Sequence, residues 1–89
     1  MATLFVRHEV TDFAKWKAAY DAFDAERREM GVTAAGAFRN DDNPNSVTAY
    51  HDFESMDAAK AFASSDRLKE AMMNAGVSGA PDIWFATRI

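Results

Sequence analysis

Apolar and polar positions alternate along residues 3–10, which predicts a β-strand with two different faces. One face carries Leu4, Val6, His8 and Val10, and the other carries Thr3, Phe5, Arg7 and Glu9. Residues 47–53 alternate in the same way, and 32–39 and 83–88 complete a set of four predicted strands. The segment 40–46 is rich in Asn and Asp, so it predicts a hairpin turn between the second and third strands.

Between the first two strands the period changes to three and four residues, which predicts one long helix. Its stripe consists of Phe13, Trp16, Tyr20, Phe23, Arg27 and Met30. Asp12 is positioned to cap the start of this helix, and Gly31 is positioned to end it. Ser55 can cap a second helix, which we expect to be interrupted at 64–66. Gly79-Ala80-Pro81 is expected to break the chain before the last strand.

The predicted order is therefore β-α-β-β-α-β over residues 1–89, which we interpret as one domain. Right-handed crossovers and a central hairpin fold this order into a four-stranded antiparallel sheet with two helices on one face. The fold class is α+β and ferredoxin-like, with strand order 4-1-3-2. The face without helices carries Phe5, Phe38, Tyr50 and Trp84. So much aromatic surface on a small chain predicts a homodimer in which two copies stack these faces.

Composition excludes several classes of function. The net charge is −4 and no basic stripe is present, which argues against nucleic-acid binding. The chain has no cysteine, so disulfides and thiolate metal sites are excluded. No apolar run approaches the length of about 20 residues that spans a bilayer. No secretory signal is visible at the N-terminus, so we expect a cytoplasmic protein without membrane association.

Two histidines are the sharpest candidates for chemistry. The strand phases place His8 and His51 on the helix-covered side of neighbouring central strands. They would lie beneath the aromatic stripe, where a histidine can move protons at neutral pH. Tyr20 could donate a hydrogen bond to a developing enolate or phenolate. The alternative is a structural role, with both imidazoles hydrogen-bonded at the edge of the core.

The rest of the stripe suggests a wall for a ligand. Arg27 is the one charged residue among aromatic ones, so it either anchors an anionic group of a substrate or extends to a carboxylate at the surface. Trp16 and Phe23 are expected to contact the substrate, although aromatic residues at helical spacing are also common in plain cores. No metal site is expected, because Asp52 points to the opposite face from His51 and a zinc site needs three converging ligands.

The sequence also resembles the dimeric α/β-barrel superfamily over nearly its whole length. The resemblance rests on Val6-Arg7-His8-Glu9-Val10, Asp12-Phe13-Ala14-Lys15-Trp16, Tyr20-Asp21, Arg27, Gly31, Arg39, Asn43-Pro44-Asn45, Val47, Leu68-Lys69-Glu70-Ala71-Met72 and Ala75-Gly76-Val77. It is nearest to small bacterial members described as cyclase-like or antibiotic-biosynthesis-monooxygenase-like. The resemblance implies a ferredoxin-like protomer whose sheet pairs with a second copy into a closed barrel, the dimeric α/β barrel.

Members of this superfamily include cofactor-free quinone-forming monooxygenases, polyketide cyclases, lactone isomerases and haem-degrading enzymes. The resemblance therefore implies a small-molecule enzyme or binding protein, with cofactor-free chemistry on an aromatic or polyketide-like substrate. His8 or His51 would be the base, with Tyr20 and Arg27 orienting the substrate. The alternatives are a non-catalytic dimeric module for metabolite binding or assembly, and a haem-handling protein with a histidine as axial ligand.

Overall fold

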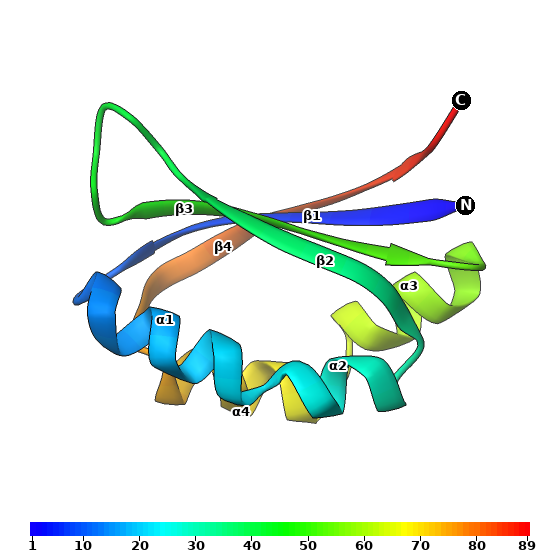
Figure 1. Cartoon of the computed structure of the whole chain (residues 1–89), viewed down its shortest axis with the longest axis horizontal. Helices are drawn as coiled ribbons and strands as arrows, with labels where there is room; N and C mark the ends of the chain where they lie inside the picture. Colours follow the sequence, from blue (N-terminus) through cyan, green and yellow to red (C-terminus); the bar gives the residue numbers. More distant parts are fainter.

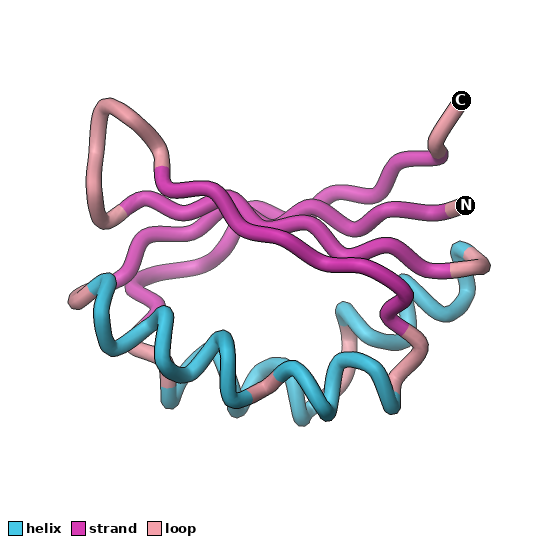
Figure 2. The backbone as a smooth tube through the Cα atoms, viewed as in Figure 1, coloured by secondary structure: helices cyan, strands magenta, loops and turns pink.

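A single antiparallel sheet forms one layer of the protein, and all helices cover the same side of it (Figures 1 and 2). The computed structural model describes residues 1–89. The strands are β1 (Ala2–Val10), β2 (Val32–Arg39), β3 (Ser46–Phe53) and β4 (Val77–Thr87), in the order β2-β3-β1-β4. The predicted strand order and the ferredoxin-like α+β class are confirmed. None of the helices has both the length and the apolar character needed to cross a membrane.

Each of the two helical segments consists of two shorter helices separated by a break. The helices are α1 (Phe13–Ala22), α2 (Asp24–Glu29), α3 (Met56–Ala63) and α4 (Asp66–Asn74). The interruption at residues 64–66 was predicted and is confirmed, whereas the prediction of one continuous helix from Phe13 onward is wrong. The break lies at Phe23. At this break the Arg27 side chain donates a hydrogen bond to the Tyr20 carbonyl, which satisfies one of the acceptors at the end of α1.

The predicted capping residues are present at the helix ends. The Asp12 carboxylate accepts hydrogen bonds from the backbone N–H groups of Ala14 and Lys15, which caps α1. Ser55 caps α3 through the N–H of Ala58. Gly31 follows α2 with a φ of 98°, a left-handed conformation that glycine adopts without a steric penalty.

The last strand differs from the prediction. Gly79-Ala80-Pro81 was expected to break the chain, but β4 runs without interruption from Val77 to Thr87. The three residues form an irregularity in the ladder, where the register with β1 shifts between Arg7 and Glu9. The strand tolerates them because β4 is an edge strand, where a missing N–H is permitted, and because Gly79 supplies a φ of 72° at the bulge.

Two apolar clusters fill the space between sheet and helices. The larger includes Leu4, Phe53 and Phe62, and the smaller is formed by Val10, Trp16, Val47 and Ala75. Residues from both clusters line a cavity that separates them. The fold therefore leaves a space under the central strands β1 and β3, at the position of the predicted histidines.

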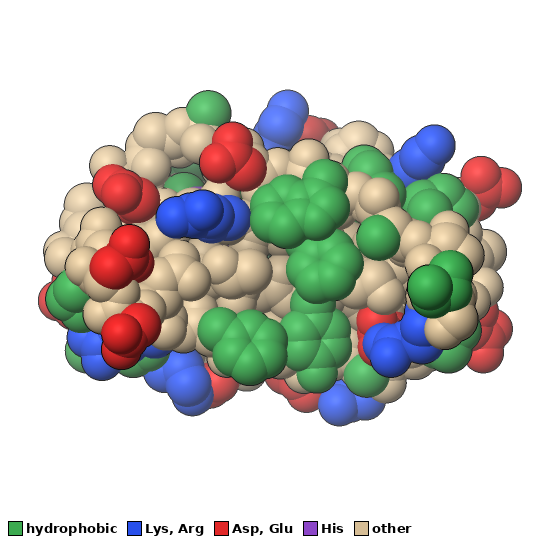
Figure 3. All heavy atoms as spheres, turned by 90° about the horizontal axis from the view of Figure 1, so that it is seen from above, with side chains coloured by type: hydrophobic (Ala, Val, Ile, Leu, Met, Phe, Trp, Pro, Cys, Tyr) green, Lys and Arg blue, Asp and Glu red, His purple; other side chains and the backbone are tan.

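The opposite face of the sheet carries a patch of aromatic side chains with no helix over it (Figure 3). The rings of Phe5 and Trp84 stack with centroids 5.5 Å apart, and Phe38 and Tyr50 lie 6.3 Å apart. Phe38 is 62% exposed and Trp84 is 44% exposed. At one end of this face the Arg88 guanidinium lies 3.0 Å from the Asp52 carboxylate. We call the four rings Phe5, Phe38, Tyr50 and Trp84 the open-face patch.

Candidate functional site

The sheet register brings both histidines to the helix-covered side. Leu4 pairs with His51 and His8 pairs with Val47 across the β1–β3 ladder, and all four side chains share one face. Both histidines are nearly fully buried, with exposed fractions of 7% for His8 and 5% for His51. A buried imidazole has two polar nitrogens that need partners, so its surroundings determine what it can do.

All six residues predicted for the site line one cavity of about 50 Å³. They are His8, Trp16, Tyr20, Phe23, Arg27 and His51. The cavity is otherwise lined by small and apolar residues: Val6, Ala19, Ala49, Leu68, Ala71, Met72 and Ala75. The sheet contributes the histidines, α1 contributes aromatic rings, and α4 contributes apolar side chains.

Aromatic rings form one wall of the cavity. Trp16 and Tyr20 are one helical turn apart on α1 and stack with centroids 4.9 Å apart. The His8 ring lies 5.7 Å from the Trp16 ring, and the His51 ring lies 5.2 Å from that of Phe62. Each imidazole is thus held against an aromatic surface, which orients it without using either ring nitrogen.

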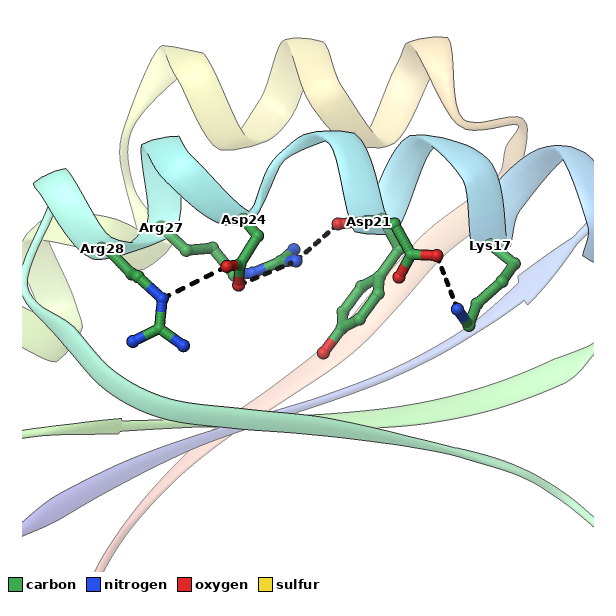
Figure 4. Close-up of polar contacts among 6 residues, drawn as sticks. Lys17, Asp21, Asp24, Arg27 and Arg28 are labelled. Atoms are coloured by element: carbon green, nitrogen blue, oxygen red, sulfur yellow. Dashed lines mark hydrogen bonds and ion pairs between the residues drawn. The ribbon is translucent and has the colours of Figure 1, made fainter.

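Arg27 carries the only full positive charge on the cavity wall. Its side chain is only 4% exposed, yet it also reaches a half-exposed carboxylate, as the surface alternative required. Its guanidinium carbon lies 4.0 Å from the centroid of the Tyr20 ring, and its nearest carboxylate is that of Asp24, at 3.6 Å (Figure 4). Asp24 is half exposed and also contacts Arg28 at 3.2 Å, so it neutralises Arg27 only in part.

Four buried nitrogens on this wall have no hydrogen-bond partner within the chain. They are both ring nitrogens of His8, Nδ1 of His51 and Nε of Arg27. Leaving a buried donor or acceptor unpaired costs about 1–3 kcal/mol, so such groups are uncommon in native proteins. These nitrogens are concentrated around one cavity with an otherwise apolar wall, which leaves unused hydrogen-bonding capacity at that position.

Burial sets the protonation state of the site. Desolvation lowers the pKa of His8, and it lowers the pKa of His51 to about 4, where the charge of Arg27 acts in the same direction and Asp52 opposes it. Burial also raises the pKa of Tyr20, with the Arg27 charge partly offsetting the shift. At neutral pH the site therefore contains two neutral imidazoles, a protonated phenol and one guanidinium cation.

Comparison with known protein families identifies the family of this chain. The sequence model of the antibiotic biosynthesis monooxygenase family matches residues 1–73. The chain belongs to this family. No curated protein sequence matches the chain.

Solved structures of several antibiotic biosynthesis monooxygenase family members and related proteins share the fold. SnoaB, a cofactor-independent oxygenase from Streptomyces nogalater, is 15% identical, with a TM-score of 0.75 over 99% of this chain and 94% of that one. The monooxygenase ActVA-Orf6 from Streptomyces coelicolor, solved with nanaomycin D, is 21% identical, with a TM-score of 0.72 over 99% and 87%. A conserved protein from Methanosarcina mazei is 13% identical, with a TM-score of 0.77 over 99% and 92%.

The family match confirms the resemblance drawn from the sequence. In this member of the antibiotic biosynthesis monooxygenase family, sequence reasoning found the sheet and α1–α2 sides of the cavity but missed the α4 side. Leu68 and Met72, four residues apart, line the cavity together with Ala71 and Ala75. Their four-residue spacing was the available signal, but these residues were used only for the family resemblance. No group of three or more His, Cys, Asp or Glu side chains converges in the chain.

Proposed function

We propose that this member of the antibiotic biosynthesis monooxygenase family oxygenates a small phenolic substrate in the cavity between sheet and helices, without a resident cofactor. The observation that carries the proposal is the set of unpartnered nitrogens of His8, His51 and Arg27 around one aromatic-lined cavity. The family supports oxygenation, and the structural neighbour SnoaB is described as a cofactor-independent oxygenase. ActVA-Orf6, solved with nanaomycin D, supports a substrate with fused rings.

The reaction begins with removal of a phenolic proton. His8 is the proposed base, because it is neutral at pH 7 and neither of its ring nitrogens has a partner, so the one without a hydrogen is free to accept a proton. Arg27 stabilises the phenolate, since its charge is only partly neutralised by Asp24. The electron-rich ring carbon para to the phenolate oxygen then reacts with dioxygen. One oxygen atom becomes the new quinone carbonyl and the other leaves as water, with the substrate supplying all four electrons.

Tyr20 and His51 have supporting roles. Tyr20 keeps its proton at neutral pH because burial raises its pKa, so its hydroxyl can donate a hydrogen bond to the developing oxyanion. His51, with a pKa of about 4, is a weak base and acts as a neutral hydrogen-bonding group that positions the substrate. Trp16 and Phe23 provide flat apolar surface for the substrate rings.

Oxygen uptake with 1,5-dihydroxynaphthalene tests the proposal, because the product, 5-hydroxy-1,4-naphthoquinone, is coloured. We expect catalysed uptake with one dioxygen consumed per quinone formed. His8→Gln should lower kcat at least 100-fold, the lower end of the contribution of a general base. The matched control is His51→Gln, which should raise KM more than it lowers kcat. Full activity in His8→Gln would exclude this residue as the base.

A binding titration separates catalysis from the alternatives. NMR signals of the two histidines should shift on addition of the naphthalenediol. A shift without any oxygen uptake would favour a non-catalytic metabolite-binding module. A Soret band on addition of haem, with no response to phenols, would favour haem handling.

We also propose that the protein works as a homodimer formed through the open-face patch. The patch supports this proposal because four aromatic rings lie side by side on a face that no helix covers. Stacking of two such faces would bury Phe38 and Trp84, which are largely exposed in one chain. Sedimentation at micromolar concentration should give a particle of twice the chain mass, and a stable monomer would contradict the proposal.

A further inference from the structure

The cavity is too small for the substrate class proposed above. Its volume of about 50 Å³ holds a few water molecules, whereas sites for drug-sized ligands usually measure about 300–1,000 Å³. A second space of about 410 Å³ lies outside it, as a groove between the α1–α2 segment and α4. The groove is lined by Ala19, Ala22, Phe23, Glu26, Arg67, Glu70, Ala71 and Asn74.

The cavity and the groove share three lining residues. Ala19 on α1, Ala71 on α4, and Phe23 at the break between α1 and α2 contribute to both walls. Two of these side chains are single methyl groups, so the partition between the two spaces is thin at their positions. The third is the Phe23 ring at the break between α1 and α2, where the N–H and C=O of Phe23 keep their helical hydrogen bonds to Ala19 and Arg27. The wall therefore opens at this point by movement of the ring and not of the backbone.

We propose that the groove is the outer half of the substrate site and that the substrate enters between α1 and α4. This inference rests on the proposed function. The ligand class is a flat, fused-ring molecule with a phenolic reactive end and a second polar group at its far end. The reactive end lies against the unpartnered nitrogens of His8, His51 and Arg27. The far end lies in the groove, where Asn74 and Glu70 offer hydrogen-bonding groups.

Ion pairs between α4 and α2 cross the groove, and these contacts must break if the cavity and the groove are to join. Arg67 on α4 lies 3.6 Å from the Glu26 carboxylate and 3.5 Å from the Glu29 carboxylate, both on α2. All three side chains are about half exposed or more, so these pairs stabilise the closed arrangement only weakly. The ion pairs are therefore only a weak barrier to movement of α4 away from α2, and the groove, at about 410 Å³, is by itself within the volume range of ligand pockets.

Quenching of Trp16 fluorescence tests the passage. The chain has two tryptophans, so a Trp84→Phe background leaves Trp16, on the cavity wall, as the only one. In this background, acrylamide and 1,5-dihydroxynaphthalene should both quench Trp16. Ala71→Phe, which fills the shared wall, should lower the quenching constants at least threefold, and Phe23→Ala should raise them. The matched control is Ala61→Phe, on the exposed side of α3, which should change neither constant.

Two results would overturn the inference in different ways. If Ala71→Phe is folded and quenching of Trp16 is unchanged, the passage lies elsewhere, while the proposed function stands. If neither probe quenches Trp16 in the background protein and no oxygen uptake occurs, the proposed function fails and the inference fails with it.

A second variant decides the question if Ala71→Phe does not fold. Asn74 is exposed on α4, so Asn74→Ala should leave the fold intact. It should raise the Kd of 1,5-dihydroxynaphthalene at least threefold and leave the Kd of 1-naphthol unchanged, because 1-naphthol lacks the second hydroxyl. Equal effects on both ligands would show that the far end of the ligand does not reach the groove.

Discussion

The guanidinium carbon of Arg27 lies 4.0 Å from the centroid of the Tyr20 ring, and the same side chain donates a hydrogen bond to the Tyr20 carbonyl. One arginine therefore does two things. It satisfies a carbonyl acceptor at the end of α1, and it brings a positive charge to the cavity wall beside the Tyr20 ring. The same side chain therefore contacts the helix break and supplies the charge of the site.

Removal of this charge should shift two pKa values in the same direction. In Arg27→Met the pKa of His51 should rise, because the Arg27 charge contributes to lowering it. The pKa of Tyr20 should also rise, because Arg27 partly offsets the effect of burial. NMR titration of the histidine and tyrosine ring signals measures both. The control is Arg28→Met, since Arg28 is exposed and pairs with Asp24 outside the cavity. A fall in either pKa would contradict this account of the site.

Stability should decline when the solution is acidified below pH 6.5. The folded state holds His51 with a pKa of about 4, below the ordinary value of 6.5, so the unfolded chain binds more protons between these values. His51 alone should reduce the free energy of unfolding by about 2 kcal/mol between pH 7 and pH 5. Urea titrations at the two pH values measure the loss, and His51→Gln should remove most of that contribution. An equal loss in the variant would assign the effect to other groups.

The open-face patch should control association. In Trp84→Ala the stack with Phe5 is lost, and the dimer dissociation constant should rise at least tenfold, as expected for a buried aromatic anchor. Sedimentation over a range of concentrations gives the constant. Met73→Ala is the matched control, because Met73 is an exposed apolar residue on α4 and not on the open face. Similar dissociation constants for the two variants would argue against the patch as the interface.

The Tyr50 ring leaves no room for a side chain at Gly36. Gly36 and Tyr50 pair directly across β2 and β3, and a Cβ at Gly36 would lie 2.6 Å from Cε1 of Tyr50. Gly36→Ala should therefore displace the Tyr50 ring and cost about 1–3 kcal/mol of stability. In a Tyr50→Ala background the same substitution should cost less than about 0.5 kcal/mol. A double-mutant cycle by urea unfolding measures the coupling, and additive effects would show that the contact is not the reason for the glycine.

The sequence predicted the faces of the strands well and the surroundings of the site less well. His8 and His51 were placed on the helix-covered side because a period of two leaves no freedom in which face a residue occupies. The break at Phe23 was not predictable, since no glycine or proline marks it, and the side-chain contact made there joins Arg27 to a carbonyl seven residues earlier. The volume of the cavity also escaped prediction, because it depends on the packing of Leu68 and Met72 beneath α1.

The irregular first half of β4 has a consequence for how copies of this chain meet. A regular edge strand offers a ladder of free N–H and C=O groups to which another chain can add, and extended sheets and fibres grow in this way. In β4 the bulge at Gly79 and the missing N–H of Pro81 interrupt that ladder. Growth along the hydrogen-bonding direction is therefore obstructed at this edge, which protects the chain from open-ended polymerisation.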